Sequence, residues 1–516
     1  MARPALWIVR LHGYTDRMMR IAGYLNKTAL SGTEAAAKIS TAFPIVLKKQ
    51  KTADDQRTLN SSMSYLRTAM PKLSENLSLL ADETNNPQIK QLYDLSRFFE
   101  VAVQASDTMG GNKKEGRFLV LFLNDKELRP GGGFIGSYGI ITFGHYSLQS
   151  IDIHDVYDAD GQLREHVDPP AAVRDYLKNP HWFLRDSNMS PDFKENALRA
   201  EWFLDKSLGA PPFDGIIAIT TTTIEEIIGV YGEITLPDTG QLITKENFYQ
   251  KTQDAVHENF FPGSRQKQTT LSSLAQTMLL EFDRVPKERL GKTVKDMLDK
   301  KEIVAFTKNE PLQKILEQRN WAGRMKPPSV DYVFPVETNV GVNKVNRFVT
   351  RSSSLEVKLS KSQMTKHIYK LRLRNDYNGT DSSNNIYKNY FQLYMPNGSM
   401  VSSVLYDGQN LAYQVFDHNG YRIPTVYVEV PPQSDRTLTI IYTVPNVVKT
   451  GIDTVYNLTF QKQTGVATSD VSVAITLPPG SSLLSKTFIA TIRGNIVSYK
   501  GALETDSHFA MKFTVP

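Results

Sequence analysis

The chain has 516 residues, of which 40% are apolar and 22% are charged, and its formal net charge is +6. This composition is that of a soluble globular protein with two to four domains, and it excludes a largely disordered or collagen-like chain. The charge is too small to form the clustered basic face of a nucleic-acid binder, so we expect no nucleic-acid partner.

The sequence contains no cysteine, which excludes disulfides, thiolate metal sites and cysteine nucleophiles. Avoidance of thiols over so long a chain favours a protein exported by a bacterium over a cytosolic protein with few cysteines. The apolar stretch at residues 5–9 is too short for a signal-peptide core, and no run of about 18 consecutive apolar residues occurs. If the protein is attached to a membrane, we therefore expect the anchor to lie outside this chain.

Residues 1–115 are predicted to form a helical arm. Apolar side chains recur there at steps of three and four, the spacing that places them on one face of a helix: Leu59, Met63, Leu66, Met70, Leu73, Leu77 and Leu80. Asn85-Asn86-Pro87 interrupts this pattern, and a second amphipathic stretch follows over residues 88–109. The two helices should form an antiparallel hairpin that packs on the next domain or serves as a stalk or a dimerisation arm.

A polar, glycine-rich linker at residues 110–116 leads into a predicted α/β domain over residues 116–330. Buried strands are expected at 117–123, 134–143, 147–154 and 215–220, because these runs are short, apolar and bounded by turn residues. Helical patterns alternate with them at 170–177, 193–208 and 222–231, and continue at 245–257, 269–282, 287–299 and 310–319. Interleaved strands and helices are typical of a layered α/β domain.

The pattern changes at residues 331–516, where short alternating runs such as 354–359 and 368–373 are separated by Asn-Gly and Asp-Gly turns. These features predict antiparallel sheets arranged as one or two β-sandwiches. The expected fold class is therefore a multidomain α+β protein with a helical hairpin, a central α/β domain and a C-terminal antiparallel β-sandwich region.

The most unusual run, residues 124–137, directly follows the first buried strand, where open α/β sheets bind ligands. Backbone amides of Gly131, Gly132 and Gly133 could face an anion, and Arg129 offers a guanidinium suited to phosphate. Asp125 could hold Mg²⁺, with Asn124 and Glu127 in support. The alternative is a tight turn whose glycines only let two chain segments cross.

Two further polar segments are candidates for the same site. Asp158 and Asp160 lie two residues apart ahead of a glycine, as in a cation-binding loop, although a solvated turn explains them as well. In residues 182–193, Arg185 could bind phosphate with Asp186 and Asp192 nearby. Alternatively, Asp192 or Ser190 caps the following helix, and Arg185 is an internal salt-bridge partner.

Three of these runs together resemble the DUF4012 family: residues 124–137, residues 185–193, and Phe213-Asp214-Gly215-Ile216-Ile217-Ala218-Ile219 with the following Gly232-Glu233-Ile234. Similarity extends over about residues 55–516 and includes Gln461-Lys462-Gln463-Thr464-Gly465. The resemblance implies a membrane-anchored, outward-facing bacterial protein without an established activity.

The order of strands and polar turns is more distantly similar to the LytR-CpsA-Psr phosphotransferases. That resemblance implies Mg²⁺ and a polyprenyl-pyrophosphate-linked glycan as ligands, with Arg129, Arg185 and Asp125 in matching positions. The family's Arg-Ser/Thr-Asp-Thr reads Arg129-Pro130-Gly131-Gly132 here, so one of its aspartates is missing.

Two functions therefore remain open at the level of sequence. The first is a non-enzymatic assembly or binding role at the bacterial cell surface, with envelope glycans, other surface proteins or a second copy of the chain as partners. The second is a Mg²⁺-dependent phosphotransferase that moves polyprenyl-pyrophosphate-linked glycopolymers onto the cell wall.

Overall fold

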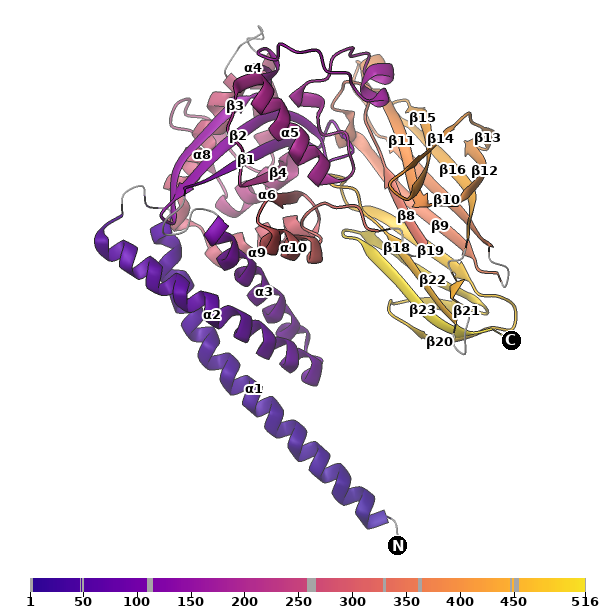
Figure 1. Cartoon of the computed structure of the whole chain (residues 1–516). Helices are drawn as coiled ribbons and strands as arrows, with labels where there is room; N and C mark the ends of the chain where they lie inside the picture. Colours follow the sequence, from indigo (N-terminus) through magenta and orange to yellow (C-terminus); the bar gives the residue numbers. More distant parts are fainter. Residues whose placement is uncertain are drawn as a thin grey trace.

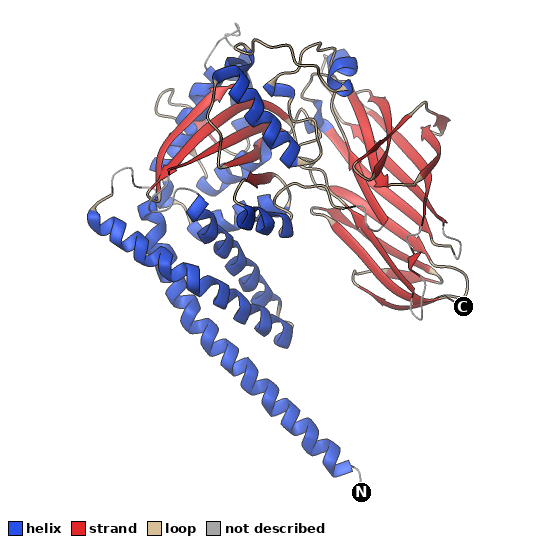
Figure 2. Ribbon diagram, viewed as in Figure 1, coloured by secondary structure: helices blue, strands red, loops and turns tan. Residues whose placement is uncertain are grey.

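The computed structural model describes residues 3–46, 48, 51–108, 115–257, 266–327, 331–360, 364–445, 448–449 and 454–515. A helical arm, a central sheet covered by helices and a large β-sandwich follow one another along the chain (Figures 1 and 2). The prediction of a mixed α/β protein with a helical N-terminal region and several multi-stranded sheets is confirmed. Most of the glycine-rich linker, residues 110–114, lies outside the described residues.

The arm consists of three helices, α1 (Arg3–Val46), α2 (Ala53–Thr84) and α3 (Pro87–Thr108). The predicted break between α2 and α3 is present, because Asn85 adopts a left-handed conformation with φ 50° and Pro87 opens the next helix. The apolar stripe of α2 is buried against α1 and α3. The N-terminal half of α1 projects beyond the other two helices (Figure 1).

The central sheet has five strands in the order β3-β2-β1-β4-β7. Their bounds are β1 (Glu115–Asn124), β2 (Phe134–Gly144), β3 (Ser147–Asp155), β4 (Gly215–Thr220) and β7 (Ile303–Thr307). Only the β1–β4 pair is parallel, whereas β1–β2, β2–β3 and β4–β7 are antiparallel. Four of these strands match the sequence prediction closely, and β7 was missed.

Helices cover both faces of this sheet (Figure 2). One core packs α5 (Phe193–Leu208) against β1, β2 and β4, and a second packs α6 (Thr221–Tyr231), α7 (Phe248–His257) and α8 (Gln266–Leu280) on the opposite face. The remaining elements are α4 (Val156–Asp160), α9 (Lys287–Asp299), α10 (Glu310–Gln318) and the small hairpin β5 (Ile234–Thr235) and β6 (Leu242–Ile243). The helix expected at 170–177 is only a short irregular turn at Ala172–Tyr176.

The C-terminal strands form one continuous sandwich rather than two separate ones. Sheet I has the order β13-β12-β16-β10-β9-β19-β22-β21, and sheet II has the order β14-β15-β11-β8-β18-β23-β20, with β17 paired to β18. Parallel pairs β9–β19 and β8–β18 join the two halves within each sheet. A single core therefore extends from Val333 to Phe513.

The strands of sheet I are β9 (Val349–Lys358), β10 (Met364–Asn375), β12 (Met400–Tyr406), β13 (Gln409–Asn410), β16 (Ser434–Pro445), β19 (Ser469–Thr476), β21 (Thr491–Arg493) and β22 (Ile496–Leu503). Those of sheet II are β8 (Asp331–Val336), β11 (Tyr387–Pro396), β14 (Gln414–His418), β15 (Tyr421–Val430), β17 (Val448–Lys449), β18 (Thr454–Phe460), β20 (Ser482–Lys486) and β23 (Ser507–Thr514). Burial alternates along strands such as β10, as expected for strands with one face on the core.

None of the helices within the described ranges is long and apolar enough to cross a membrane.

Candidate functional site

The glycine-rich loop begins where β1 ends and folds back over the end of that strand. Asn124 starts the turn, its side-chain oxygen accepting a hydrogen bond from the Lys126 amide at 3.2 Å. The loop closes with bonds from the Phe134 amide to Glu127 O at 3.0 Å and from the Gly132 amide to Arg129 O at 2.9 Å. A Cβ at Gly133 would lie 2.6 Å from the Asn124 carbonyl carbon, so only glycine allows this close return.

Arg129 lies inside the protein, with 1% of its surface exposed. Its Nη1 donates to Asn339 O at 2.9 Å and to Leu128 O at 3.3 Å, and its Nη2 donates to Glu127 Oε1 at 2.8 Å. Asp186 Oδ1 lies 3.6 Å from the same Nη2. Nε alone has no hydrogen-bond partner among the described residues. The guanidinium is thus bound by protein oxygens, and a phosphate could reach it only by displacing them.

Asp186 links Arg129 to the second arginine that the sequence singled out. Arg185 Nε lies 3.6 Å from Asp186 Oδ2, and Arg185 Nη1 donates to Asp160 Oδ2 at 3.0 Å. Five of the candidate residues therefore form an alternating chain of charges that runs Glu127, Arg129, Asp186, Arg185, Asp160. The Arg185 guanidinium also lies 4.4 Å from the centre of the Phe183 ring, and 22% of its side chain is exposed.

The carboxyl of Asp160, at the end of this chain, is buried at 6% exposure. Burial raises its pKa to about 7, because removal of water penalises the charged form more than Arg185 and the Leu184 amide stabilise it. Asp160 therefore changes its charge near neutral pH, while it accepts bonds from both of these groups.

A segment of the sandwich, Gln461–Gly465, closes the glycine-rich loop from the other side. Gln463 Nε2 donates to Glu337 O at 2.9 Å, to Arg129 O at 3.1 Å and to Pro130 O at 3.3 Å. A Cβ on Gly465 would lie 2.1 Å from Gly132 O, and one on Gly132 would lie 2.8 Å from Thr464 Cγ2. The two glycines therefore bring the backbones of the two domains into direct contact.

Buried charges extend this contact on the side of β7. Lys301 Nζ donates to Asp506 Oδ1 at 2.6 Å, and Lys462 Nζ lies 3.7 Å from Glu302 Oε1. All four side chains are almost fully buried. Burial raises the pKa of Glu302 and lowers that of Lys462, since desolvation disfavours the charged form of each group. We call the glycine-rich loop, Gln461–Gly465 and these charges the interdomain joint.

Asp125 has different partners from the acidic residues of the charge chain. Its carboxylate accepts bonds from Lys126 Nζ at 2.7 Å and from the hydroxyl of Thr222, in the first turn of α6, at 2.7 Å. Asp158 and Asp160 lie in α4, which Asp155 caps. Throughout the described part of the chain, no three histidine, aspartate or glutamate side chains are grouped so that they could hold a metal ion. The structure thus does not bring Asp125, Asp158 and Asp160 together.

Asp192 caps helix α5, which is the structural one of the two roles that the sequence suggested for it. One carboxylate oxygen accepts a bond from the Lys194 amide at 3.1 Å and so caps α5, and the other accepts one from Arg324 Nε at 2.9 Å. Ser190 contributes at the same turn, where its hydroxyl donates to Glu195 at 2.7 Å.

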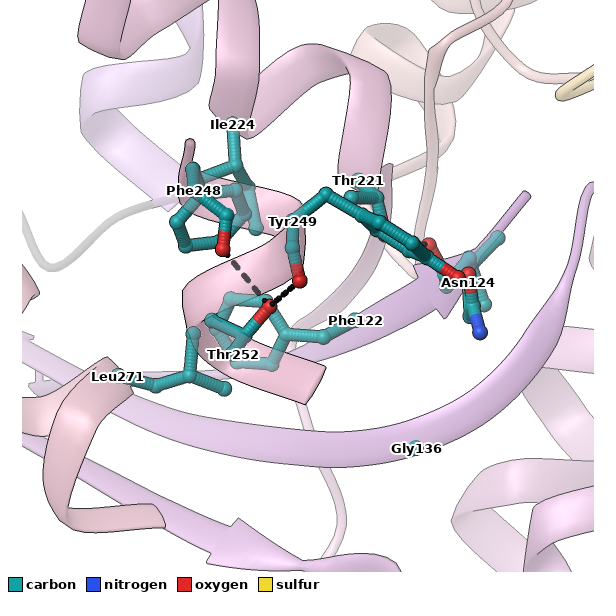
Figure 3. A pocket seen from close by; sticks show the side chains of 10 residues that line it. Phe122, Asn124, Gly136, Thr221, Ile224, Phe248, Tyr249, Thr252 and Leu271 are labelled. Carbon is teal, nitrogen blue, oxygen red and sulfur yellow. Dashed lines mark hydrogen bonds between the residues drawn. The ribbon is translucent and has the colours of Figure 1, made fainter. Parts of the chain in front are cut away.

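A cavity of about 50 Å³ lies on the opposite side of β1, between the sheet and α6 and α7 (Figure 3). Its lining is mostly apolar and comprises Phe122, Leu123, Asn124, Gly136, Thr221, Ile224, Phe248, Tyr249, Thr252 and Leu271. Of the candidate residues only Asn124 borders it. The space is sufficient for small groups only, and neither arginine of the charge chain lines it.

The joint contains residues that the sequence analysis did not select. Glu337 and Asn339 belong to no recognisable sequence motif. Lys301, Glu302 and Asp506 are charged residues in segments whose sequence does not indicate burial. The one available signal was Gln461–Gly465, which was noted as a family-like motif without a role. Its contact with the glycine-rich loop explains both motifs, because each supplies one side of the interdomain joint.

Comparison with known families identifies one part of the chain. Residues 113–256 match the DUF4012 family model, a protein family of unknown function. The DUF4012 segment includes the whole glycine-rich loop, Arg185 and Asp192, whereas the partner segment Gln461–Gly465 lies beyond it. The match is shorter than the resemblance expected over residues 55–516.

No curated protein matches the chain. Among solved structures, native leukotriene A4 hydrolase from Saccharomyces cerevisiae is similar to it with 12% identity and a TM-score of 0.23, over 32% of this chain and 29% of that one. An M1 zinc metallopeptidase from Deinococcus radiodurans is similar with 11% identity and a TM-score of 0.18, over 32% of this chain and 42% of that one. The chain thus spans less than half the length of either protein.

Proposed function

We propose that this chain is a non-enzymatic assembly or binding protein of the bacterial cell envelope, located outside the cytoplasm. The observation that carries the non-enzymatic role is the burial of Arg129 and of Gly131–Gly133 in the interdomain joint. The polar atoms that resembled a phosphate site have protein partners: the Gly131 amide donates to Asn188 O, the Gly132 amide donates to Arg129 O, and the Arg129 guanidinium donates to Glu127 and Asn339. In this proposal the charge chain and the glycine-rich loop fix two domains together, and the outer surfaces of the arm and the sandwich bind partners.

Support for the location comes from composition and family. The absence of cysteine fits an exported bacterial protein, and residues 113–256 match the DUF4012 family, whose members the sequence resembles. The test is protease accessibility in intact cells that produce the protein with its natural flanking sequence. Digestion by added protease, while a cytoplasmic marker stays intact, is the expected result. Protection until the cells are lysed would contradict the location.

The alternative is a Mg²⁺-dependent phosphotransferase, of the kind that the LytR-CpsA-Psr resemblance implies, acting on polyprenyl-pyrophosphate-linked glycopolymers. It requires cations that can reach a pyrophosphate, and in the charge chain only Arg185 has part of its guanidinium side chain exposed. It also requires carboxylates gathered around a metal, and Asp125, Asp158 and Asp160 form no such group in the part of the chain that the structure describes. The geometry therefore favours the non-enzymatic role.

Titration calorimetry with a soluble polyprenyl pyrophosphate analogue and Mg²⁺ distinguishes the two functions. The variants are Arg185→Ala and, as a control, Arg174→Ala, since Arg174 is exposed and its salt bridge is to the neighbouring Asp175. We expect no saturable binding to any of the three proteins at millimolar ligand. Saturable binding by the wild type and Arg174→Ala that is lost in Arg185→Ala would refute the non-enzymatic proposal.

A further inference from the structure

One row of residues crosses the outer face of sheet I at the ends of its strands. Strand register pairs neighbours in the order Met400, Thr443, Lys366, Lys358, Thr476, Ile496, Arg493. Directly paired residues project from the same face of a sheet, and none of these seven is buried. At the usual strand spacing the row is about 29 Å long. We call it the distal row.

The distal row carries positive charge that nothing in the described structure neutralises. Lys358 and Lys366 are direct cross-strand partners, an arrangement that is unfavourable by itself because like charges repel. Among the described residues neither lysine has an ion-pair partner, and the same holds for Arg493. The nearest acidic residue along β9, Glu356, lies 3.7 Å from Lys370 instead. Residues 471–503 contain no aspartate or glutamate.

Exposed aliphatic side chains lie near one end of this row, at the edge of sheet I and in the connection that leads to it; Ile492 projects from the face opposite to Arg493, because its cross-strand partner Val497 is buried in the core. Ile489 is 90% exposed in the connection between β20 and β21, and Ile492 in the edge strand β21 is 51% exposed. Leu484, Ile496 and Met400 are also well exposed. Figure 1 places β20 and β21 at the end of the sandwich that lies away from the central domain. Cations and protruding aliphatic residues are therefore combined at one end of the molecule.

We propose that this end of the sandwich docks on the surface of an anionic lipid bilayer. Lys358, Lys366 and Arg493 would contact lipid phosphates, and Ile489 and Ile492 would enter the boundary between headgroups and acyl chains. A bilayer fits better than an acidic protein, because highly exposed aliphatic side chains accompany the cations and match the apolar layer that lies beneath lipid phosphates. The proposal goes beyond the envelope role above and does not rest on it, since binding is measured with purified protein and vesicles.

The test is cosedimentation with vesicles of phosphatidylcholine, with and without phosphatidylglycerol. We expect binding only to the anionic vesicles, and we expect it to weaken strongly at about 0.5 M salt, where charge interactions are screened. The triple variant Lys358→Ser, Lys366→Ser, Arg493→Ser should bind about 100-fold more weakly, at about fivefold for each cation lost. The double variant Ile489→Ser, Ile492→Ser should weaken binding as well.

Matched control variants distinguish binding by this particular surface from binding caused by the overall positive charge of the protein. The triple variant Lys206→Ser, Lys251→Ser, Lys292→Ser removes the same charge from exposed positions of the central domain, and Leu280→Ser removes an apolar side chain that is 80% exposed elsewhere. Both controls should bind like the wild type. Equal weakening by the control triple variant would overturn the proposal, as would absence of binding to anionic vesicles. Sedimentation velocity measures the oligomeric state of the same variants. If the wild type forms a dimer and Ile492→Ser abolishes it, the edge strand binds a second copy of the chain and the membrane proposal is overturned.

Discussion

The sharpest test of the interdomain joint is the replacement of Gly465 by alanine, compared with the same change at Gly240. Both glycines have almost the same left-handed backbone conformation, with φ 69° at Gly465 and φ 65° at Gly240. A non-glycine residue there costs about 1–2 kcal/mol in either position. The two sites differ in their surroundings, since a Cβ at Gly240 has no atom within 4 Å, whereas one at Gly465 lies 2.1 Å from Gly132 O.

Backbone atoms on both sides leave Gly465→Ala no flexible side chain to displace, so the two domains must move apart. Overpacking of this kind costs about 1–3 kcal/mol. Each hydrogen bond from Gln463 Nε2 that breaks adds about 1 kcal/mol. With one of these bonds broken, we therefore expect Gly465→Ala to lower the free energy of unfolding by about 3–6 kcal/mol, and Gly240→Ala by about 1–2 kcal/mol, the backbone cost alone.

Urea unfolding followed by far-ultraviolet circular dichroism, to which the helices and strands of both domains contribute, measures both values by linear extrapolation. If the joint couples the domains, Gly465→Ala should also separate the unfolding of the sandwich from that of the central domain, which Gly240→Ala should not do. Equal losses of stability in the two variants would show that Gly132 and Gly465 are not in contact, and the reasoning about the joint would fail.

Two other predictions concern the charge chain. Arg129→Met should lower the free energy of unfolding by about 3–5 kcal/mol, because Glu127 and Asp186 are left buried without their partner. Adding Glu127→Gln to that variant should restore part of the loss, and urea unfolding that shows no recovery would contradict the pairing. Because the pKa of Asp160 is raised to about 7 in the folded state, the folded protein holds a proton that the unfolded chain releases near its usual pKa. The stability contribution of Asp160 should therefore fall as the pH rises from about 4 to about 7. Thermal melts across this range should show the fall in the wild type and a flatter profile in Asp160→Asn, and identical profiles would argue against a buried acid.

Much of the local structure could be predicted because single residues determine it. Asn85-Asn86-Pro87 ends α2 and starts α3 where expected, and α5 and α9 have the predicted bounds. Asp407-Gly408 and Asn419-Gly420 form hairpin turns with positive φ at both residues. In each case a preference of the backbone or a periodic pattern acts within a few residues, and the rest of the fold agrees with it.

What could not be predicted depends on contacts between distant segments. β7 is a run of five residues between two helices, and its apolar pattern is too short to distinguish a strand from a helix end. The glycine-rich loop posed the same difficulty at the level of function. Three glycines beside an arginine fit an anion site and a close crossing of two chains equally well, and only the position of Gln461–Gly465 distinguishes the two.

The long separation along the chain between the two halves of the joint has a consequence for biosynthesis. Gln463 is made 334 residues after Arg129, whose carbonyl oxygen it binds. At a synthesis rate of about 5–20 residues per second, the glycine-rich loop waits about 20–70 seconds on the ribosome before its partner exists. During that interval the carbonyl oxygens of Arg129 and Pro130 lack the Gln463 side chain that donates to them in the folded protein. Chaperones that recognise unfinished domains should therefore engage this chain late, and release it once residue 465 has emerged.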